Sequence, residues 1–197
     1  REGSLKEALA TQVFSSLGLL RQEPTYLLQD DLSDSVQAAA VLSLIGRGCE
    51  RPSEIAARLQ VPQTALGRPL RRLIDLGLVR KDTPFGADEK GNKKSIYKVA
   101  DQFLGFWYRF VQPKLSDSHF LERAEDWKPF KSDYRQYLGG VWENLLREKF
   151  RASRWWGAGL DHKPLEIDLI AESEDKKTLL VGEAKLSLSE KERESAL

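Results

Sequence analysis

Three short apolar helical patterns followed by two strand-like segments constrain the fold of this chain more than any other feature. The helical patterns cover Ser35–Ile45, Glu54–Leu59 and Thr64–Leu76, and the strand-like segments are Leu78–Lys81 and Ser95–Val99. Apolar residues spaced three or four apart indicate amphipathic helices, whereas short runs rich in Val, Ile and Tyr indicate strands. The order of these segments therefore predicts one compact module between residues 35 and 100.

Residues that begin and end helices stand at the borders of these segments. Ser53, after Pro52, is a suitable N-cap for the second helix, and Gly77 follows the third. A polar loop rich in Gly, Asp and Lys, Pro84–Lys94, separates the two strands. Three short helices and a β-hairpin are typical of a winged helix, which is a helix-turn-helix with a wing. We predict this fold for residues 35–100 and an α+β or α/β class for the chain.

The predicted module is the basic part of a nearly neutral chain. Residues 35–100 carry 12 basic and 6 acidic side chains, a net charge of +6, against −3 for residues 1–34 and −2 for residues 101–197. This excess indicates an anionic partner, although a solvated surface explains it equally well. If the partner is DNA, the candidate phosphate contacts lie on the third helix and the wing: Arg68, Arg71, Arg72, Lys90, Lys93 and Lys94. Four of them, Arg71, Arg72, Lys93 and Lys94, are predicted to lie on one basic surface.

Two features leave DNA binding open at this stage. Gln63 is the only Asn or Gln near the third helix, and these are the residues that read adenine edges. Pro69 removes a backbone donor, so the regular helix either begins near Pro69 or has a distorted first turn. Winged helices also serve as docking modules for proteins or for other domains of the same chain. DNA binding and docking therefore both remain hypotheses.

The segments on either side of this module are less specific. Residues 1–34 contain a helical pattern with little to bury alone, which predicts the tail of a preceding domain. Asp101–Val111 is apolar over most of a helix, so we expect a buried helix ended by Pro113; an aromatic platform for stacked bases is the alternative. Ser116–Ser132 is polar and predicts a linker, which completes a region spanning residues 101–132.

Residues 133–197 predict one helix followed by three strands. The helix runs from Tyr134 to Phe150, and the strands are Arg154–Trp156, Leu165–Ile170 and Leu179–Lys185. Glu183 and Lys185 are two positions apart in the last strand, so we expect both on one face of the sheet.

The acidic residues of this region predict a cation site. Asp168 in the adjacent strand can face Glu183, and with the carbonyl of Ala184 the two carboxylates suit Mg²⁺. Such a metal polarises a phosphodiester and activates water, Lys185 can orient that water, and Glu143 can add a ligand. A surface hairpin with a salt bridge is the alternative explanation of the same residues.

Taken together, these segments resemble a known family. Asp168 with Glu183-Ala184-Lys185 resembles the PD-(D/E)XK nuclease superfamily, and the chain is similar to the C-terminal region of the archaeal-type ATPase family. The matching blocks are Pro52–Ala56, Leu73–Val79, Asp101–Phe110, Gly140–Glu143, Arg154–Trp156, Glu166–Ile170 and Val181–Lys185.

The resemblance implies a winged helix followed by an incomplete restriction-endonuclease-like αβββ domain. It also implies an AAA+/STAND-like ATPase domain upstream in the same protein. One hypothesis is then an Mg²⁺-dependent nuclease that the winged helix positions on DNA, and the alternative is a non-catalytic docking module with a relic nuclease fold. The sequence departs from the pattern because no Pro directly precedes Asp168. The chain contains no GxxxxGK[ST] loop, so we expect no P-loop ATP site within it.

The sequence also excludes or disfavours several other classes of protein and of site. No apolar run approaches the roughly 20 residues of a membrane span and no signal peptide opens the chain, so a cytoplasmic protein is expected. Cys49 is alone and is expected to be a small buried hydrophobe. His119 and His162 lack partners at zinc-ligand spacing. The chain lacks methionine and starts at Arg1, so we expect a fragment of a longer protein.

Overall fold

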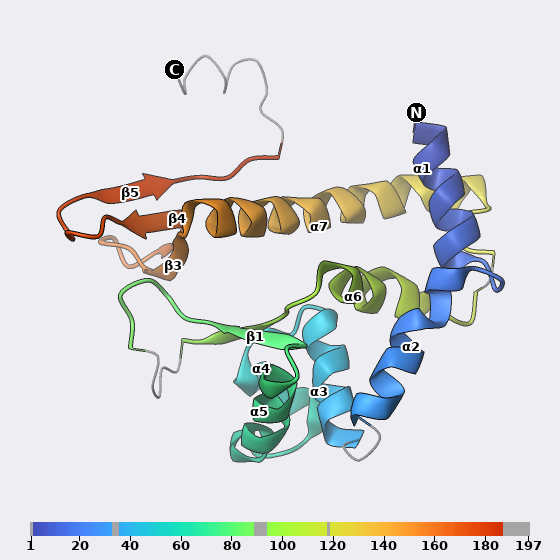
Figure 1. Cartoon of the computed structure of the whole chain (residues 1–197), viewed down its shortest axis with the longest axis horizontal. Helices are drawn as coiled ribbons and strands as arrows, with labels where there is room; N and C mark the ends of the chain where they lie inside the picture. The colour runs from blue at the N-terminus through green and yellow to red at the C-terminus, as the bar shows by residue number, and fades with distance from the viewer. Residues whose placement is uncertain (1, 33–35, 89–93, 118, 187–197) are drawn as a thin grey trace. The chain divides into compact units, whose positions relative to one another are not determined.

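The computed structural model describes residues 2–32, 36–88, 94–117 and 119–186 of the 197-residue chain (Figure 1). Within these residues the protein is a mixed α+β structure with seven α-helices and two small antiparallel sheets. The helices are α1 (Glu2–Leu9), α2 (Leu19–Leu32), α3 (Val36–Gly46), α4 (Pro52–Leu59), α5 (Gly67–Asp75), α6 (Gln102–Phe106) and α7 (Ala124–Phe150). Short π-helices cover Ala10–Phe14 and Trp107–Val111, and 3-10 helices cover Gln63–Leu66 and Gln112–Lys114.

The chain folds into two compact units, each built from two segments. Unit 1 contains Arg1–Asp82 and Ser95–Lys131, and unit 2 contains Thr83–Lys94 and Ser132–Leu197. The predicted domain borders after residues 34, 100 and 132 remain predictions.

The predicted order of three helices and a hairpin is present in unit 1. Helices α3, α4 and α5 precede strands β1 (Val79–Asp82) and β2 (Ile96–Val99), which pair antiparallel with Val79 opposite Val99 (Figure 1). The predicted N-cap at Ser53 is wrong, because α4 begins at Pro52 and Arg51 occupies the cap position. Proline favours the first helical position because its fixed φ suits the helix and its missing N–H costs nothing there.

Helix α5 ends as predicted at a glycine. Gly77 has φ of +69° and donates to the carbonyl of Ile74, while the N–H of Leu78 donates to the carbonyl of Leu73. This pair of bonds is the Schellman motif, which satisfies carbonyls left over at a helix end. The turn directs the chain from α5 into β1.

An aromatic cluster forms much of the core of unit 1. Phe14 packs edge-to-face against Phe120 and Phe130, with ring centroids 5.0 Å and 5.8 Å apart. Phe110 joins the cluster with its ring centroid 5.4 Å from that of Phe130. Residues 120–130 were predicted as a polar linker, but Phe120, Leu121 and Phe130 are buried. Charged and polar residues dominate this segment, which is why the sequence indicated a linker, although its apolar residues are spaced close to the helical period: Phe120, Leu121, Ala124, Trp127 and Phe130.

The segment from Gln102 to Val111 is interior, as predicted. The side chain of Asp101 caps α6 by accepting from the N–H of Leu104 at 2.6 Å. Trp107 is 3% exposed, which excludes the alternative of a base-stacking platform. Its indole N–H donates to the carbonyl of Arg21 at 2.7 Å. The helical path continues through Pro113 to Lys114, so Pro113 lies in the last 3-10 turn instead of ending the helix before it.

Two close contacts in unit 1 depend on particular residues. Arg21 is 3% exposed, and its guanidinium donates to the carbonyls of Phe14 and Leu115. Gly46 at the end of α3 lies against Tyr108; a Cβ added there would be 2.3 Å from the Cβ of Tyr108. Burial raises the pKa of Tyr108 to about 12. Helix α3 therefore approaches the segment after α6 so closely that position 46 has no room for a side chain.

Cys49 lies in unit 1 and is 2% exposed, which confirms its prediction as a buried hydrophobe. Burial is the main cause that raises the pKa of the Cys49 thiol, and the negative charge of the nearby Glu54 carboxylate is the second. Among the described residues, no helix combines the length and hydropathy that crossing a bilayer requires.

Unit 2 consists of most of α7 and a three-stranded sheet. Strands β3 (Ser153–Ala158), β4 (Pro164–Glu172) and β5 (Leu179–Gly182) lie in the order β3-β4-β5, all antiparallel. Helix α7 begins at Ala124 instead of the predicted Tyr134 and contains Pro129 in its second turn. The helix–strand–strand–strand order that the sequence predicts is present, and Leu169 and Ile170 are its most buried strand residues.

Candidate functional site

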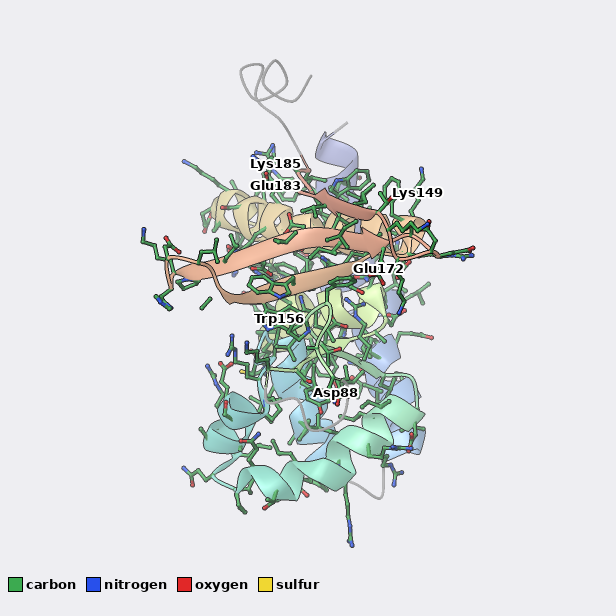
Figure 2. All side chains as sticks on the ribbon, turned by 90° about the vertical axis from the view of Figure 1, so that its left-hand side faces the viewer. Asp88, Lys149, Trp156, Glu172, Glu183 and Lys185 are labelled. Atoms are coloured by element: carbon green, nitrogen blue, oxygen red, sulfur yellow. The ribbon has the colours of Figure 1, made fainter. Side chains whose placement is uncertain are left out.

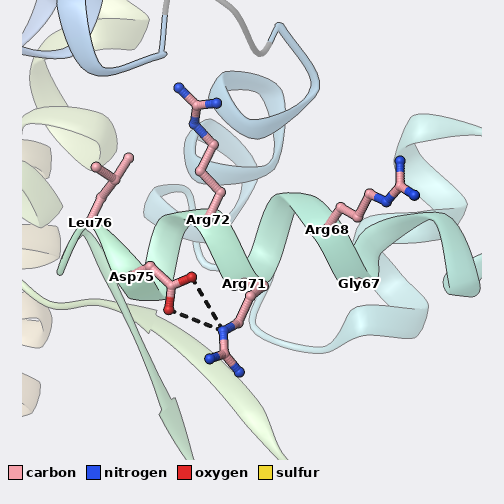
Figure 3. Close-up of a pocket in the computed structure, with 6 residues that line it drawn as sticks. All are labelled: Gly67, Arg68, Arg71, Arg72, Asp75 and Leu76. Atoms are coloured by element: carbon pink, nitrogen blue, oxygen red, sulfur yellow. Dashed lines mark hydrogen bonds and ion pairs between the residues drawn. The ribbon is translucent and has the colours of Figure 1, made fainter.

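Helix α5 carries the densest group of exposed cations on a regular element. Its buried side is formed by Pro69, Leu70 and Leu73, which follow the helical period. Its other side exposes Arg68, Arg71 and Arg72, which project from the ribbon in Figure 3. An open depression of about 720 Å³ lies along this side, lined by Gly67, Arg68, Arg71, Arg72, Asp75 and Leu76.

The proline in α5 does not distort it. The α-helix begins at Gly67, directly after the 3-10 turn Gln63–Leu66, so Pro69 lies in the first turn. The first four N–H groups of a helix have no partner within it, so a proline there removes no helical bond. The first alternative predicted from the sequence, a regular helix that starts near Pro69, is correct.

Arg71 has a carboxylate partner on the same helix. The Nε of Arg71 donates to both oxygens of Asp75, at 3.0 Å and 3.3 Å (Figure 3). Both side chains are largely exposed, at 78% and 59%. An exposed pair of this kind adds little stability, on the order of 0.3–0.5 kcal/mol for this spacing in a helix. The main effect of Asp75 is to offset the charge of Arg71 locally and to hold its guanidinium in place.

The hairpin loop that was predicted to supply lysines belongs to unit 2. The N–H of Phe85 donates to the carbonyl of Arg154 in β3 at 2.8 Å, and the indole N–H of Trp156 donates to the carbonyl of Lys94 at 3.2 Å. Both ends of the loop are thus bonded to β3. Lys94 is exposed, and Lys90 and Lys93 lie outside the described residues. The single basic surface predicted for α5 and the wing stays a prediction.

Asp168 is linked to the chain segment that follows β5. Its Oδ2 accepts a hydrogen bond from the N–H of Ala184 at 2.9 Å, and its backbone carbonyl accepts from Arg147 at 3.1 Å. Arg147 also lies 3.6 Å from Glu143 on α7. Arg147 therefore connects two of the predicted site residues, and the sequence analysis missed it. Its position four residues after Glu143 was the available signal, because such residues are neighbours on a helix.

The placement predicted for Glu183 and Lys185 within a strand is wrong. Strand β5 ends at Gly182, so both residues follow it and the strand pleat does not fix their common side. Continuing the β4–β5 register would pair Ala184 with Ile167. The N–H of Ala184 instead bonds the Asp168 side chain, which explains why the ladder ends there. Glu183 and Lys185 remain neighbours, with Oε1 and Nζ 3.6 Å apart (Figure 2).

The predicted Mg²⁺ ligands do not form a cation cage in this arrangement. Glu183 is 72% exposed and paired with Lys185, while Glu143 is paired with Arg147. Among the described residues, no three His, Cys, Asp or Glu side chains are grouped as a metal site requires. In this arrangement each of the three carboxylates has a partner of its own, because Asp168 also accepts from the N–H of Ala184, and the Mg²⁺ site stays a prediction.

Comparison with known proteins adds a family match and a relative without an assigned activity. Residues 107–196 match the DUF234 family, described as "Archaea bacterial proteins of unknown function". An uncharacterized protein of Methanocaldococcus jannaschii, MJECL04, is 32% identical over 177 residues. The match covers 82% of this chain and 38% of that protein, so the chain spans less than half the length of the relative.

Among solved structures, the chain matches the crystal structure of the transcriptional regulator SlyA. The match covers 75% of this chain and 92% of that chain, at 15% sequence identity. The TM-score of 0.33 is too low to support a common fold.

Proposed function

We propose that residues 36–99 form a winged-helix module that binds duplex DNA through α5. The observation that carries the proposal is the exposed arginine side of α5, a helix that packs against α3, the 3-10 turn Gln63–Leu66 and β1. In helix-turn-helix modules, the helix that enters the major groove is the one at this place in the order of elements. Arginine suits this role because its charge persists at every relevant pH and its planar donors match phosphate oxygens.

Most of the affinity is expected to come from phosphate contacts. Each contact releases counterions, so the logarithm of the binding constant falls linearly with the logarithm of the salt concentration. Arg68 and Arg72, four residues apart on one stripe of α5, are the residues we assign to these contacts. Gln63, exposed in the 3-10 turn before α5, is a further candidate for a base edge.

Replacing Arg68 and Arg72 together by alanine should weaken binding to every duplex tested. The slope of log Kobs against log salt should become shallower by about 2 units, close to 1 for each lost phosphate contact. Fluorescence anisotropy at four or more salt concentrations measures this slope. The control is the double variant Lys128→Ala, Arg135→Ala, which removes two exposed cations from α7. An unchanged slope in the Arg68, Arg72 variant would remove α5 from the interface.

Intramolecular docking is the alternative for this module, and one observation favours it. The hairpin loop, which corresponds to the wing, is hydrogen-bonded at both ends to β3 of unit 2. A wing held in this way is engaged within its own chain. No DNA affinity of the chain even at low salt would favour docking over DNA binding.

Phosphodiester cleavage in unit 2 is a second candidate function. It is favoured by the hydrogen bond that ties Ala184 to Asp168, because this bond brings Glu183-Ala184-Lys185 beside the Asp168 carboxylate. The resemblance to archaeal-type ATPases adds the proposal that an ATPase domain of the same protein acts together with this region. The cofactor that the resemblance implies is Mg²⁺, and its requirement is an outcome of the test below.

Asp168→Asn and Glu183→Gln should each abolish Mg²⁺-dependent cleavage by the whole protein while leaving DNA binding largely intact, and Lys185→Ala should slow cleavage strongly. Asparagine keeps an oxygen that accepts from the N–H of Ala184, so Asp168→Asn removes charge without removing this bond. Nicking of supercoiled plasmid, with and without Mg²⁺, gives the measurement. Glu172→Gln at the exposed end of β4 is the matched control. Cleavage that survives Asp168→Asn, or that is absent from the whole protein, would exclude this site.

A further inference from the structure

The exposed charges of α5 fall on two neighbouring stripes of the helix. Arg68 and Arg72 are four residues apart and share one stripe, and Arg71 and Asp75 are four residues apart and share the next. Figure 3 shows Arg71 projecting on a different side of the ribbon from Arg68 and Arg72. The second stripe contains a hydrogen-bonded pair of opposite charges, because both oxygens of Asp75 accept from the Nε of Arg71.

Asp75 holds Arg71 by one side of its guanidinium. Both carboxylate oxygens accept from Nε, and these are the hydrogen bonds that Arg71 makes among the described residues. The two terminal nitrogens lie at the other end of the group, away from Asp75 (Figure 3). Arg71 therefore presents a fork of two parallel donors from a position that Asp75 fixes.

The carboxylate makes Arg71 a poor phosphate ligand compared with Arg68. Asp75 cancels the charge of Arg71 locally, and a phosphate that approached the pair would be repelled by Asp75. A neutral base edge meets no such repulsion. The end of a guanidinium matches the O6 and N7 acceptors of guanine in the major groove, which is the commonest specific arginine contact with DNA.

We propose that Arg71, positioned by Asp75, is a specificity-determining residue that recognises guanine in the major groove, while Arg68 and Arg72 contact phosphates. The inference rests on the proposed DNA-binding function and names the base that it selects. Asp75 acts as a positioning residue, since it holds Arg71 without contacting the base itself. Sequence selectivity of this helix then does not require asparagine or glutamine.

The test begins with selection of bound sequences from a randomised duplex by the 197-residue chain. Bound duplexes should share a guanine, and replacing that guanine by 7-deazaguanine should weaken binding by about 5- to 100-fold. 7-Deazaguanine keeps O6 and normal base pairing but lacks N7. It therefore removes one of the two acceptors that the guanidinium of Arg71 would bind. Arg71→Ala should abolish this difference while changing the salt slope by much less than 1 unit.

The variant Asp75→Ala separates positioning from a merely structural role. Without Asp75 the charge of Arg71 becomes available to phosphates, so the salt slope should steepen by about 1 unit while the preference for guanine over 7-deazaguanine falls. Arg68→Ala is the matched control, because it should make the slope shallower by about 1 unit and leave the preference intact. Arg71 and Asp75 are both largely exposed, so these variants should fold normally.

The outcomes distinguish this inference from the function it rests on. No binding to any duplex at low salt would overturn both. Binding that depends on Arg68 and Arg72 but is equal for guanine and 7-deazaguanine would overturn only the assignment of Arg71. A loss of about 1 unit of salt slope in Arg71→Ala, with the base preference retained, would also overturn it, because Arg71 would then be a phosphate contact.

Discussion

Replacing Trp107 by alanine should lower the free energy of unfolding by about 3–5 kcal/mol, the usual cost of truncating a large buried aromatic residue. The side chain is 3% exposed and packs edge-to-face on Tyr108, with ring centroids 5.1 Å apart. Alanine would leave a cavity and would also remove the indole donor of the Arg21 carbonyl. Urea denaturation followed by circular dichroism measures the loss.

The variant Trp107→Phe divides this loss into its parts. Phenylalanine retains an aromatic ring but lacks the N–H that donates to the Arg21 carbonyl, and the loss of one such hydrogen bond costs about 0.5–1.5 kcal/mol. The loss in Trp107→Phe should therefore be smaller than in Trp107→Ala. Equal stability of Trp107→Ala and the unmodified chain would contradict the interior position of this segment.

Gly46→Ala is the second substitution with a large expected effect. Its new Cβ would lie 2.3 Å from the Cβ and 2.6 Å from the Cγ of Tyr108. A Cβ atom moves only with its backbone, so rotation of the Tyr108 side chain cannot relieve the overlap. We expect a loss of about 3 kcal/mol, the upper end of the usual cost of overpacking, measured as a lower midpoint in urea.

Gly67→Ala provides the matched control for this substitution. Gly67 begins α5 with ordinary helical dihedrals, and a Cβ there meets nothing within 4 Å. Alanine should therefore be neutral or stabilise by up to about 1 kcal/mol, since it restricts the unfolded chain. A similar loss in both variants would mean that the contact with Tyr108 is not the cause in Gly46→Ala.

The helices and turns that depend only on residues close to them in the chain were predictable from the sequence. Helices α3, α4 and α5 follow apolar periodicity, and the end of α5 at Gly77 depends on one glycine with positive φ. The interior position of Trp107 follows from a segment that is apolar on nearly all sides. In each case the deciding information lies within a few neighbouring residues.

Features that depend on distant partners were not predictable in this way. The end of β5 at Gly182 depends on a side-chain acceptor, Asp168, that competes for the N–H of Ala184. The role of Arg147 depends on a backbone carbonyl of β4, which no periodicity reveals. The wing was predicted as part of the module of residues 35–100, but it bonds Arg154 and Trp156, which lie more than 60 positions later in the chain.

The attachment of the hairpin loop to β3 makes unit 2 discontinuous along the chain. Its two segments, Thr83–Lys94 and Ser132–Leu197, are separated by 37 residues of unit 1, Ser95–Lys131. A recombinant piece that begins at Ser132 would lack the carbonyl of Lys94 and leave the indole N–H of Trp156 without that acceptor. Isolation of the sheet for biochemistry therefore requires a circular permutation or a graft that supplies the loop, because no single cut of the chain yields it whole.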